Sequence, residues 1–251
     1  MQTKTALITG GSRGLGRDMA LNLATNGVDI IFTYHNNLEK AKEVILEIEA
    51  LGQKAKAFQF DANTPNTASQ LITTITKFLR SENGSQKFDY LINNAGTGTF
   101  NFIENTTEVQ FDEMMNIHLK SVYNLTQASL PYLNNGGRIV NISSGLARFS
   151  LPGMSAYAIM KGGIEVFTRY LAKELGSRNI TANVIAPGAV ATDFAGGSNK
   201  DPEKAALISS ITALGRVGEP EDIGGTVAFL CSEKAGWING QRIEISGGML
   251  V

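Results

Sequence analysis

Cysteine and long hydrophobic runs are scarce in this chain of 251 residues. Its single cysteine, Cys231, leaves no partner for an intramolecular disulfide and no cysteine cluster for a metal ion. No apolar run reaches the roughly 18 residues that a membrane-spanning helix requires, and the N-terminal segment has too few apolar residues for a signal peptide. We therefore expect a cytoplasmic protein that has no membrane anchor and binds no metal.

An excess of charge of one sign is lacking as well. The chain carries 22 Lys and Arg residues against 23 Asp and Glu residues, which gives a formal net charge of −1. Because the two signs are interspersed, we expect no basic surface for nucleic acid or for an anionic membrane. No stretch rich in Pro, Ser and Gly divides the chain. We expect one domain over residues 1–251 and a small molecule as its partner.

Glycine, by contrast, is abundant. The 27 glycines exceed by about nine the number that an average usage of roughly 7% would give. They follow no three-residue period, which excludes a collagen-like chain, and the 43% hydrophobic content excludes a disordered one. The surplus points to places where the backbone turns sharply or approaches a ligand closely.

Short apolar runs alternate with longer amphipathic stretches, which is the pattern of strand-helix-strand units and a parallel sheet. The expected strands are Thr5–Thr9, Asp29–Tyr34, Lys56–Asp61, Tyr90–Asn93, Gly137–Ile142, Thr181–Ala186 and Arg242–Ile245. The expected helices are Gly14–Asn26, Glu39–Leu51, Thr64–Ser81, Thr107–Asn134, Ser155–Gly176 and Pro220–Cys231. The fold class is thus α/β, a Rossmann-type, doubly wound, seven-stranded parallel sheet flanked by helices. The interval 189–217 contains no obvious strand and is expected to form a substrate lid.

A glycine-rich loop directly follows the first expected strand. Gly10, Gly14 and Gly16 are spaced so that the backbone can turn, approach a pyrophosphate and pack the next helix closely. The N-terminus of that helix would face the anion with free N–H groups and the positive end of its dipole. The other residues of this expected dinucleotide-binding loop are Ser12, Arg13 and Leu15. A tight turn of purely structural use is the alternative.

The end of the second expected strand indicates which dinucleotide binds. An Asp or Glu there would accept hydrogen bonds from the adenosine ribose, but the residues are Tyr34 and His35. Arg13 could instead pair with a 2′-phosphate through its guanidinium. We therefore expect NADP(H) as the cofactor, with NAD(H) as the alternative. Asp61 would meet the adenine edge or cap the following helix.

Six motifs resemble, in order and spacing, those of the short-chain dehydrogenases/reductases. They are Thr9-Gly10-x-x-x-Gly14-x-Gly16, Asn93-Asn94-Ala95-Gly96, Asn116, Ser144, Tyr157-x-x-x-Lys161 and Pro187-Gly188. The resemblance extends over essentially the whole chain. Within the family the sequence is most similar to the 3-oxoacyl-(acyl-carrier-protein) reductases and related carbonyl reductases.

The expected catalytic pair is Tyr157 and Lys161. They lie four residues apart in a helix, so both side chains project from one face. An adjacent ammonium would lower the pKa of the Tyr157 phenol toward neutrality, and Tyr157 would give its proton to a carbonyl. Ser144 would hydrogen-bond the substrate oxygen, with Ser143 as the alternative. The resemblance selects Ser144. It also implies that a backbone distortion at Asn116 holds a water linking Lys161 to solvent, unless Asn116 is an ordinary helix residue.

The resemblance also implies the remaining cofactor contacts. Tyr157 and Lys161 would lie at the nicotinamide ribose. The nicotinamide carboxamide would meet the segment that carries Pro187, Gly188, Val190 and Thr192. The adenosine side would be lined by Ala62, Asn93, Ala95 and Gly96.

The expected function is NADPH-dependent, reversible reduction of a ketone or 3-oxoacyl carbonyl to a secondary alcohol. An NAD-dependent alcohol dehydrogenase is one alternative. A dinucleotide-sensing binding protein on the same fold is another, although it should have lost Tyr157 or Lys161. Enoyl reduction is a third, but relatives with that activity usually space these two residues more widely.

Two features concern the substrate. Phe149, Met154 and Phe194 suggest an apolar cleft, although each could equally be ordinary packing. Arg178 matches a position that docks an acidic carrier protein in the related reductases. Asn134 and Asn135 stand where a second basic group would be expected, which leaves a free ketone or ketoester open.

The helices expected at Thr107–Asn134 and Ser155–Gly176 carry more apolar residues than one buried stripe requires. Related proteins pair these helices across subunits, so a homotetramer is expected. Burial within one chain would look the same.

Overall fold

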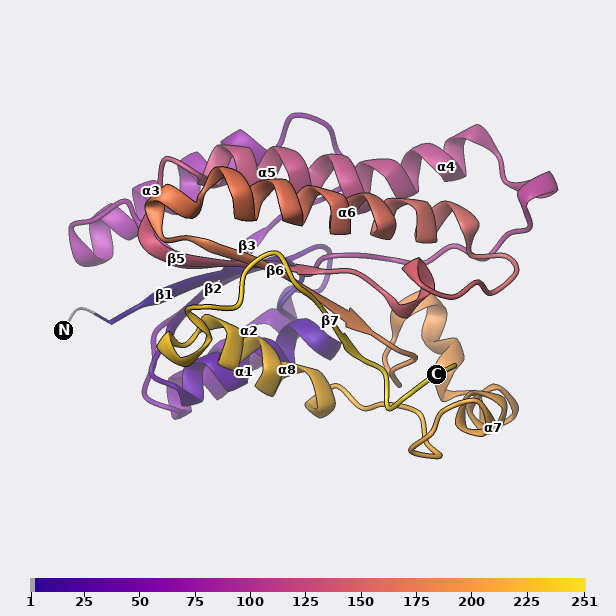
Figure 1. Cartoon of the computed structure of the whole chain (residues 1–251). Helices are drawn as coiled ribbons and strands as arrows, with labels where there is room; N and C mark the ends of the chain where they lie inside the picture. Colours follow the sequence, from indigo (N-terminus) through magenta and orange to yellow (C-terminus); the bar gives the residue numbers. More distant parts are fainter. Residues whose placement is uncertain (1–2) are drawn as a thin grey trace.

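The computed structural model describes residues 3–251 and contains a sheet of seven parallel strands (Figure 1). They are β1 (Thr5–Ile8), β2 (Asp29–Tyr34), β3 (Ala55–Gln59), β4 (Phe88–Asn93), β5 (Leu133–Ile142), β6 (Thr181–Pro187) and β7 (Arg242–Ile245). Their order across the sheet is β3-β2-β1-β4-β5-β6-β7, and each pairing between them is parallel. The expected fold class and the seven expected strands are confirmed.

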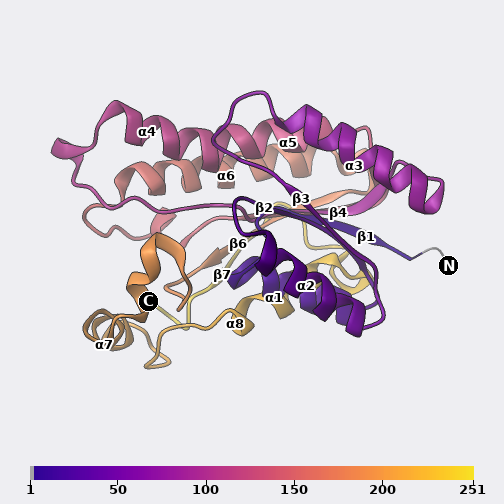
Figure 2. The ribbon, with the colours of Figure 1, turned by 180° about the vertical axis from the view of Figure 1, so that it is seen from behind.

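Helices cover both faces of the sheet (Figures 1 and 2). One side carries α3 (Ala68–Asn83), α4 (Glu108–Met115), α5 (Ser121–Ser129) and α6 (Ser155–Glu174), and the other carries α1 (Gly14–Thr25), α2 (Leu38–Ala50) and α8 (Glu221–Cys231). Successive strand residues alternate between the faces, so Ala6 and Ile8 pack with α1 and α8 while Leu7 packs with α3. No helix within residues 3–251 has both the length and the apolar character needed to cross a membrane.

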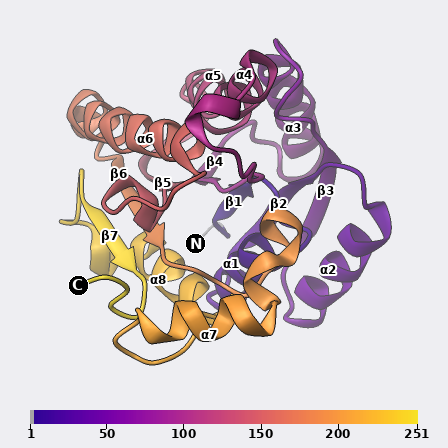
Figure 3. The same ribbon diagram turned by 90° about the vertical axis from the view of Figure 1, so that its right-hand side faces the viewer.

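The strand order reverses between β1 and β4, which are neighbours in the sheet. In doubly wound sheets, ligands bind in the crevice between the loops that follow two such strands. The glycine loop follows β1 and the segment Asn93–Gly96 begins at the end of β4, so both border this crevice. Figure 3 faces this end of the sheet, where the orange segment that includes α7 (Pro202–Ser210) lies in front of α1.

The long helix expected over Thr107–Asn134 is not continuous. A π-helical turn at Asn116–Lys120 separates α4 from α5, and α5 ends at Ser129. Leu133 and Asn134, expected at the end of this helix, belong to β5 instead, where Leu133 pairs with Phe88 of β4. Strand pairing in the buried sheet therefore outweighs the helical pattern at this point.

The segment 189–217 contains a helix that was not expected from the sequence, α7. Its start carries ordinary signals, because the Asp201 carboxylate accepts a hydrogen bond from Lys204 N at 3.0 Å and Pro202 occupies the first turn. An Asp-Pro pair ahead of a short apolar stretch could have predicted it. The other expected helices are present with small shifts, the largest at α3, which begins at Ala68 rather than Thr64.

Candidate active site

Two loops meet at the crevice between β1 and β4. The Thr9 hydroxyl accepts hydrogen bonds from the main-chain N–H groups of Asn94 and Ala95, both at 2.9 Å. The Asn94 side chain donates in turn to the carbonyls of Thr9 and Gly10, at 2.9 and 3.1 Å. Thr9 and Asn94 thus fasten the glycine loop to the loop after β4. Neither side chain was assigned this role from the sequence, although each is a polar residue at the end of a buried strand.

The glycine loop leaves the N-terminus of α1 open. α1 begins at Gly14 without a side-chain cap, so its first N–H groups are available to an anion. Gly14 has a φ of +52°, and a Cβ there would lie 3.4 Å from Thr192. A Cβ on Gly16 would lie 2.1 Å from the Gly10 carbonyl oxygen. The loop therefore needs glycine at both positions, and its uncapped helix N-terminus fits the pyrophosphate of a dinucleotide.

Three cations gather around one carboxylate beside this loop. Asp193 lies 3.6 Å from the exposed guanidinium of Arg13, 4.0 Å from Lys40 Nζ and 2.8 Å from Lys200 Nζ. Lys200 most strongly, and Lys40 and Arg13 in addition, lower the pKa of Asp193. Positive charge exceeds negative charge here, so the corner suits an anion with more than one charge.

β2 ends without a carboxylate, but Asp61, which follows the neighbouring strand β3, lies near the end of β2. The His35 ring is 3.8 Å from Asp61. Asp61 accepts hydrogen bonds from the Thr64 hydroxyl and from Asn63 N, which lower its pKa. Because α3 begins only at Ala68, Asp61 does not cap that helix. Six other expected cofactor residues lie near the carboxyl ends of β1 to β4, and each is at least partly exposed. They are Ser12, Leu15, Tyr34, Ala62, Ala95 and Gly96.

Asn93 turns into the core instead. Its amide donates to Thr126 at 3.0 Å and to Asn141 at 2.7 Å, and the Asn141 amide donates to Thr168 at 2.8 Å. These hydrogen bonds tie β4 and β5 to α5 and α6. The Asn93 side chain, only 4% exposed, therefore supports the sheet, and the expected place of Asn93 beside the adenosine is left to its main chain.

Tyr157 and Lys161 lie one turn apart on α6, and both are buried, at 7% and 5% exposure. Lys161 Nζ lies 5.5 Å from the centre of the Tyr157 ring and donates to the Ile142 carbonyl at 2.6 Å. The Ser144 hydroxyl, just beyond β5, lies close to Tyr157 and accepts a hydrogen bond from Leu146 N at 3.2 Å. The structure thus brings these three expected residues together.

Burial governs the protonation of both groups. It raises the pKa of the Tyr157 phenol, and hydrogen bonding to Ser144 offsets only part of that rise. It lowers the pKa of the Lys161 ammonium to about 7. The expected lowering of the Tyr157 pKa by Lys161 is not found, because the ammonium donates to the Ile142 carbonyl instead. A phenol that keeps its proton at neutral pH is suited to act as a donor.

Asn116 is not brought to this group. Its side chain lies 3.4 Å from Asn63 Oδ1 and lines a small pocket near the start of α3. His118, two residues later, lies beside Tyr157, with ring centres 4.9 Å apart and planes at 86°. The main chain of Asn116 begins a π-helical turn, so a backbone distortion is present at the expected residue, and this turn directs the His118 side chain toward the acid–base pair. The water expected at Asn116 stays a prediction. The sequence feature that could have indicated this placement is a single histidine between apolar residues.

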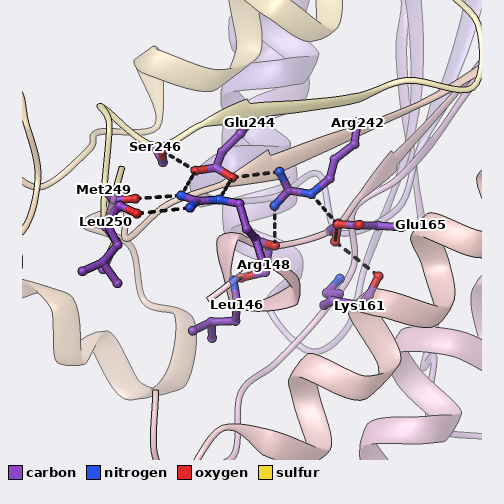
Figure 4. Close-up of polar contacts among 11 residues, drawn as sticks. Leu146, Arg148, Lys161, Glu165, Arg242, Glu244, Ser246, Met249 and Leu250 are labelled. Atoms are coloured by element: carbon purple, nitrogen blue, oxygen red, sulfur yellow. Dashed lines mark hydrogen bonds and ion pairs between the residues drawn. The ribbon is translucent and has the colours of Figure 1, made fainter. Parts of the chain in front are cut away.

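Charged side chains brace the end of β5 (Figure 4). The Ser143 hydroxyl donates to Glu165 at 2.8 Å, and Arg242 donates to Glu165 at 2.7 Å. Arg242 also donates to Glu244 at 2.8 Å and to the Ser144 carbonyl at 3.3 Å. The Ser143 hydroxyl is thus engaged elsewhere, which favours Ser144 as the serine of the site.

The segment after β6 runs from the sheet to the glycine loop. Pro187 ends β6, and Gly188 N donates to the Ile245 carbonyl at 2.9 Å. Val190 is buried and forms a bridge with Gly218. Thr192 then meets Gly14. The four residues expected at the carboxamide therefore lie on one path that ends at the dinucleotide loop.

Two of the three expected cleft residues lie beside Tyr157. The Phe194 ring centre is 5.6 Å from that of Tyr157, and Met154 packs in the same small apolar cluster. Phe149 packs elsewhere. It fills the space over Gly145 and lies under the Arg148 guanidinium at 5.3 Å.

Arg178 is engaged within the chain. Its guanidinium donates to the Leu130 carbonyl at 2.9 Å, to Asn135 Oδ1 at 3.0 Å and to the Leu133 carbonyl. These bonds fasten the connection between α5 and β5. The side chain is therefore committed to the fold rather than held out toward a carrier protein.

Comparison with known proteins agrees with this geometry. A family model described as enoyl-(acyl carrier protein) reductase matches residues 10–250. The chain belongs to the short-chain dehydrogenase/reductase family of oxidoreductases.

Its relatives include reductases of more than one kind. The 3-oxoacyl-(acyl-carrier-protein) reductase FabG of Staphylococcus aureus is 37% identical over 249 residues, which cover 98% of both chains. The angucycline C-6 ketoreductase LanV, solved with bound NADP, is 36% identical with a TM-score of 0.94 and covers 98% of this chain and 95% of its own. A short-chain dehydrogenase/reductase from Serratia marcescens is 32% identical with a TM-score of 0.91 and covers 100% of this chain and 99% of its own.

Proposed function

We propose that this protein is an NADPH-dependent carbonyl reductase that converts a ketone reversibly to a secondary alcohol. The observation that carries the proposal is the buried Tyr157 phenol, which lies between Ser144 and Lys161 near the crevice bordered by the glycine loop. A bound nicotinamide cofactor supplies the hydride in such a reaction. FabG and LanV, both named for the reduction of ketone groups, support this chemistry.

The three side chains have separate roles. Tyr157 gives its proton to the oxygen that becomes the alcohol. Ser144 donates a hydrogen bond to the same oxygen as negative charge develops on it. Lys161 stabilises the phenolate that remains and replaces its proton. Because burial raises the pKa of Tyr157, the phenol is protonated at neutral pH, which supports the direction of reduction.

The residues around the glycine loop favour NADPH over NADH. No carboxylate ends β2, and Arg13 and Lys40 stand near the place of a 2′-phosphate. LanV is solved with bound NADP. The N-terminus of α1 would hold the pyrophosphate, and Thr192 the carboxamide. A higher kcat/KM with NADH than with NADPH would contradict this preference.

A free ketone is better supported as substrate than a carrier-bound thioester. The one candidate docking arginine, Arg178, is engaged by three groups of its own chain. Met154 and Phe194 present apolar surface beside Tyr157, and segment 189–217 would act as the lid that closes over such a substrate. Ketones, β-ketoesters and acyl thioesters, assayed by NADPH absorbance, would rank these classes directly.

The outer helices support a homotetramer. On α6, Ile159, Val166 and Tyr170 are 59%, 46% and 64% exposed, and Tyr123 on α5 is 49% exposed. Apolar side chains gathered on neighbouring helices are typical of a subunit interface. Sedimentation at micromolar concentration tests this assembly, and a monomer would contradict it.

The decisive experiment replaces the acid. Tyr157→Phe should abolish ketone reduction and leave NADPH binding, measured by cofactor fluorescence, unchanged. Tyr170→Phe is the matched control, because it removes a hydroxyl from a tyrosine of the same helix that lies outside the acid–base pair. Retained turnover in Tyr157→Phe would refute the acid role.

A further inference from the structure

The Phe194 side chain reaches from the segment after β6 to the loop after β4, beside Tyr157. Its ring centre lies 5.6 Å from that of Tyr157, with the two planes inclined at 59°. The far edge of the ring points at Gly98 in the loop after β4, since a Cβ on Gly98 would lie 2.7 Å from Phe194 Cε1 and 2.8 Å from Cζ. One aromatic ring therefore fills the space between the proposed acid and this loop.

Gly98 is suited to a ring that lies against it. Its φ lies outside the left-handed region, so the backbone conformation does not itself require glycine. A side chain at this position would instead collide with the Phe194 ring and would bring its Cβ to 3.0 Å from Ala195 Cβ. What glycine provides here is a wall of bare main chain against which a flat ring fits.

The main chain that carries Phe194 is strained. Ala195, Gly196 and Gly197 follow it with φ values of +50°, +73° and +78°, all in the left-handed region. Glycine adopts this conformation freely, but alanine does so at a cost in free energy. Strain of this kind is held in place by the surrounding contacts and is typical of segments that move at functional sites. Relaxation at Ala195 would favour withdrawal of the Phe194 ring from the space beside Tyr157.

Apolar side chains continue from this space to the surface. Met154 packs in the same small cluster as Tyr157. Next to Met154, Gly153 has a φ of +86°, and a Cβ there would lie 2.5 Å from Phe100 Cε2, so the Phe100 ring lies directly on the main chain. The ring centres of Phe100 and Phe102 are 5.8 Å apart, and both residues are exposed. Exposed aromatic rings beside a buried acid indicate where an apolar substrate enters.

We propose that Phe194 holds the place of an aromatic ring of the substrate, so that the substrates of this protein are aryl ketones. The ring of the ketone displaces Phe194, lies against Gly98 and Tyr157, and brings the attached carbonyl oxygen to the Tyr157 and Ser144 hydroxyls. Displacing Phe194 loses its contact with the Tyr157 ring, and only another aromatic ring makes that contact again. The inference names the substrate class of the proposed carbonyl reductase and rests on that function.

Three ketones with the same number of carbon atoms test this substrate class. Acetophenone carries a flat aromatic ring, cyclohexyl methyl ketone a puckered saturated ring, and 2-octanone a straight chain. Ligand-observed NMR measures the Kd of each for the wild-type protein with bound NADP+, which cannot give a hydride. A merely apolar cleft would bind the two aliphatic ketones more tightly, because they are more hydrophobic. We expect acetophenone to bind most tightly, by about three- to tenfold.

Any other order of the three Kd values overturns the proposal. Tightest binding of 2-octanone would assign the space to an acyl chain. Tightest binding of cyclohexyl methyl ketone, or equal binding of all three, would show that the aromatic character of the ring has no part. None of these measurements requires turnover. Failure of the inference is therefore distinguishable from failure of the proposed function, which turnover by Tyr157→Phe decides.

Two substitutions test the displacement of Phe194. Phe194→Ala removes the ring that the substrate must displace, so the Kd of acetophenone should fall about three- to tenfold. Gly98→Ala places a methyl group against the ring of the substrate, so the Kd of acetophenone should rise about tenfold and that of 2-octanone by less. Phe229→Ala is the matched control, because it removes an exposed phenyl ring near the end of α8. It should change neither Kd by more than about twofold.

Weaker binding of acetophenone to Phe194→Ala would show that Phe194 is a wall on which the substrate stacks, and would overturn the displacement. An unchanged Kd in both Phe194→Ala and Gly98→Ala would place the substrate elsewhere and overturn the proposal as a whole. Because the two variants are expected to change the affinity in opposite directions, general damage to the fold cannot produce the expected result.

Discussion

Arg242 Nη2 donates a hydrogen bond to the main-chain carbonyl of Ser144 at 3.3 Å, so a side chain of β7 braces the serine that lies close to Tyr157. We predict that Arg242→Met lowers kcat for ketone reduction on the order of tenfold to a hundredfold, because small displacements of a reacting group are costly. The Kd of NADPH should change little, since Arg242 lies away from the glycine loop. Steady-state kinetics together with cofactor fluorescence measure both effects.

Arg148→Met is the matched control for this prediction. Arg148 donates to Glu244 at 2.7 Å and to the carbonyls of Met249 and Leu250 at 2.8 and 3.1 Å, but not to Ser144. It should lower thermal stability to a similar extent while kcat stays within about twofold. An equal loss of kcat in both variants would show that the Ser144 contact has no special part.

The features that could be predicted from the sequence depend on residues that are close together along the chain. Gly14 and Gly16 could be assigned from their spacing after an apolar run, because a strand, a turn and a helix start are local events. Asn93 and Asn94 are adjacent in the chain and point to opposite sides of the strand end, and only the packed sheet decides which of them faces the core. No sequence periodicity could assign that choice.

The surroundings of the Asn116 side chain could not be predicted for a comparable reason. A helix with 3.6 residues per turn predicts which side chains share a face, but a π-helical turn changes that relation after it begins. His118 consequently lies beside Tyr157 in place of Asn116. The contact of Arg242 with Ser144 joins residues far apart in sequence, so no local pattern could indicate it.

Stability should depend on pH through Lys161. Burial lowers the pKa of Lys161 from 10.5 to about 7. Between these values the unfolded chain binds more protons at this side chain than the folded protein does, so this group makes the free energy of unfolding rise with pH. Lys161→Met removes the titration. Relative to wild type, its stability should therefore fall by roughly 2–4 kcal/mol between about pH 6 and about pH 10.

Urea denaturation of both proteins at the two pH values measures this difference. The lost hydrogen bond to the Ile142 carbonyl affects Lys161→Met equally at both, so it cancels from the comparison. A difference in stability that is the same at low and high pH would contradict the lowered pKa.

Asp193 should compete with the cofactor for cations. Its carboxylate lies within 4.0 Å of both Arg13 and Lys40, which are proposed to meet the 2′-phosphate. Asp193→Asn should tighten NADPH binding about two- to fivefold, the range that exposed ion pairs reach. NADH, which lacks the phosphate, is the internal control and should bind unchanged. Isothermal titration at two salt concentrations tests the cause, since added salt should reduce the gain.

Two adjacent glycines of α8 should respond to alanine in opposite directions. Gly224 N donates to Asp18 at 2.7 Å where α8 packs against α1, and a Cβ on Gly224 would lie 2.0 Å from the Asp18 carboxylate. Gly224→Ala should therefore destabilise the protein by roughly 1–3 kcal/mol. Around Gly225 the nearest atom to a Cβ is Asn22 Oδ1 at 3.9 Å. Gly225→Ala should accordingly stabilise the helix by up to about 1 kcal/mol.

Thermal unfolding of the two variants tests this pair directly. Because α1 begins at the glycine loop, a displacement of α1 by Gly224→Ala should also weaken NADPH binding, whereas Gly225→Ala should leave it unchanged. Destabilisation by both variants would show that α8 tolerates no side chain on this face. Stabilisation by both would show that α1 and α8 can separate to admit a methyl group, and that Asp18 does not hold them at the distance observed.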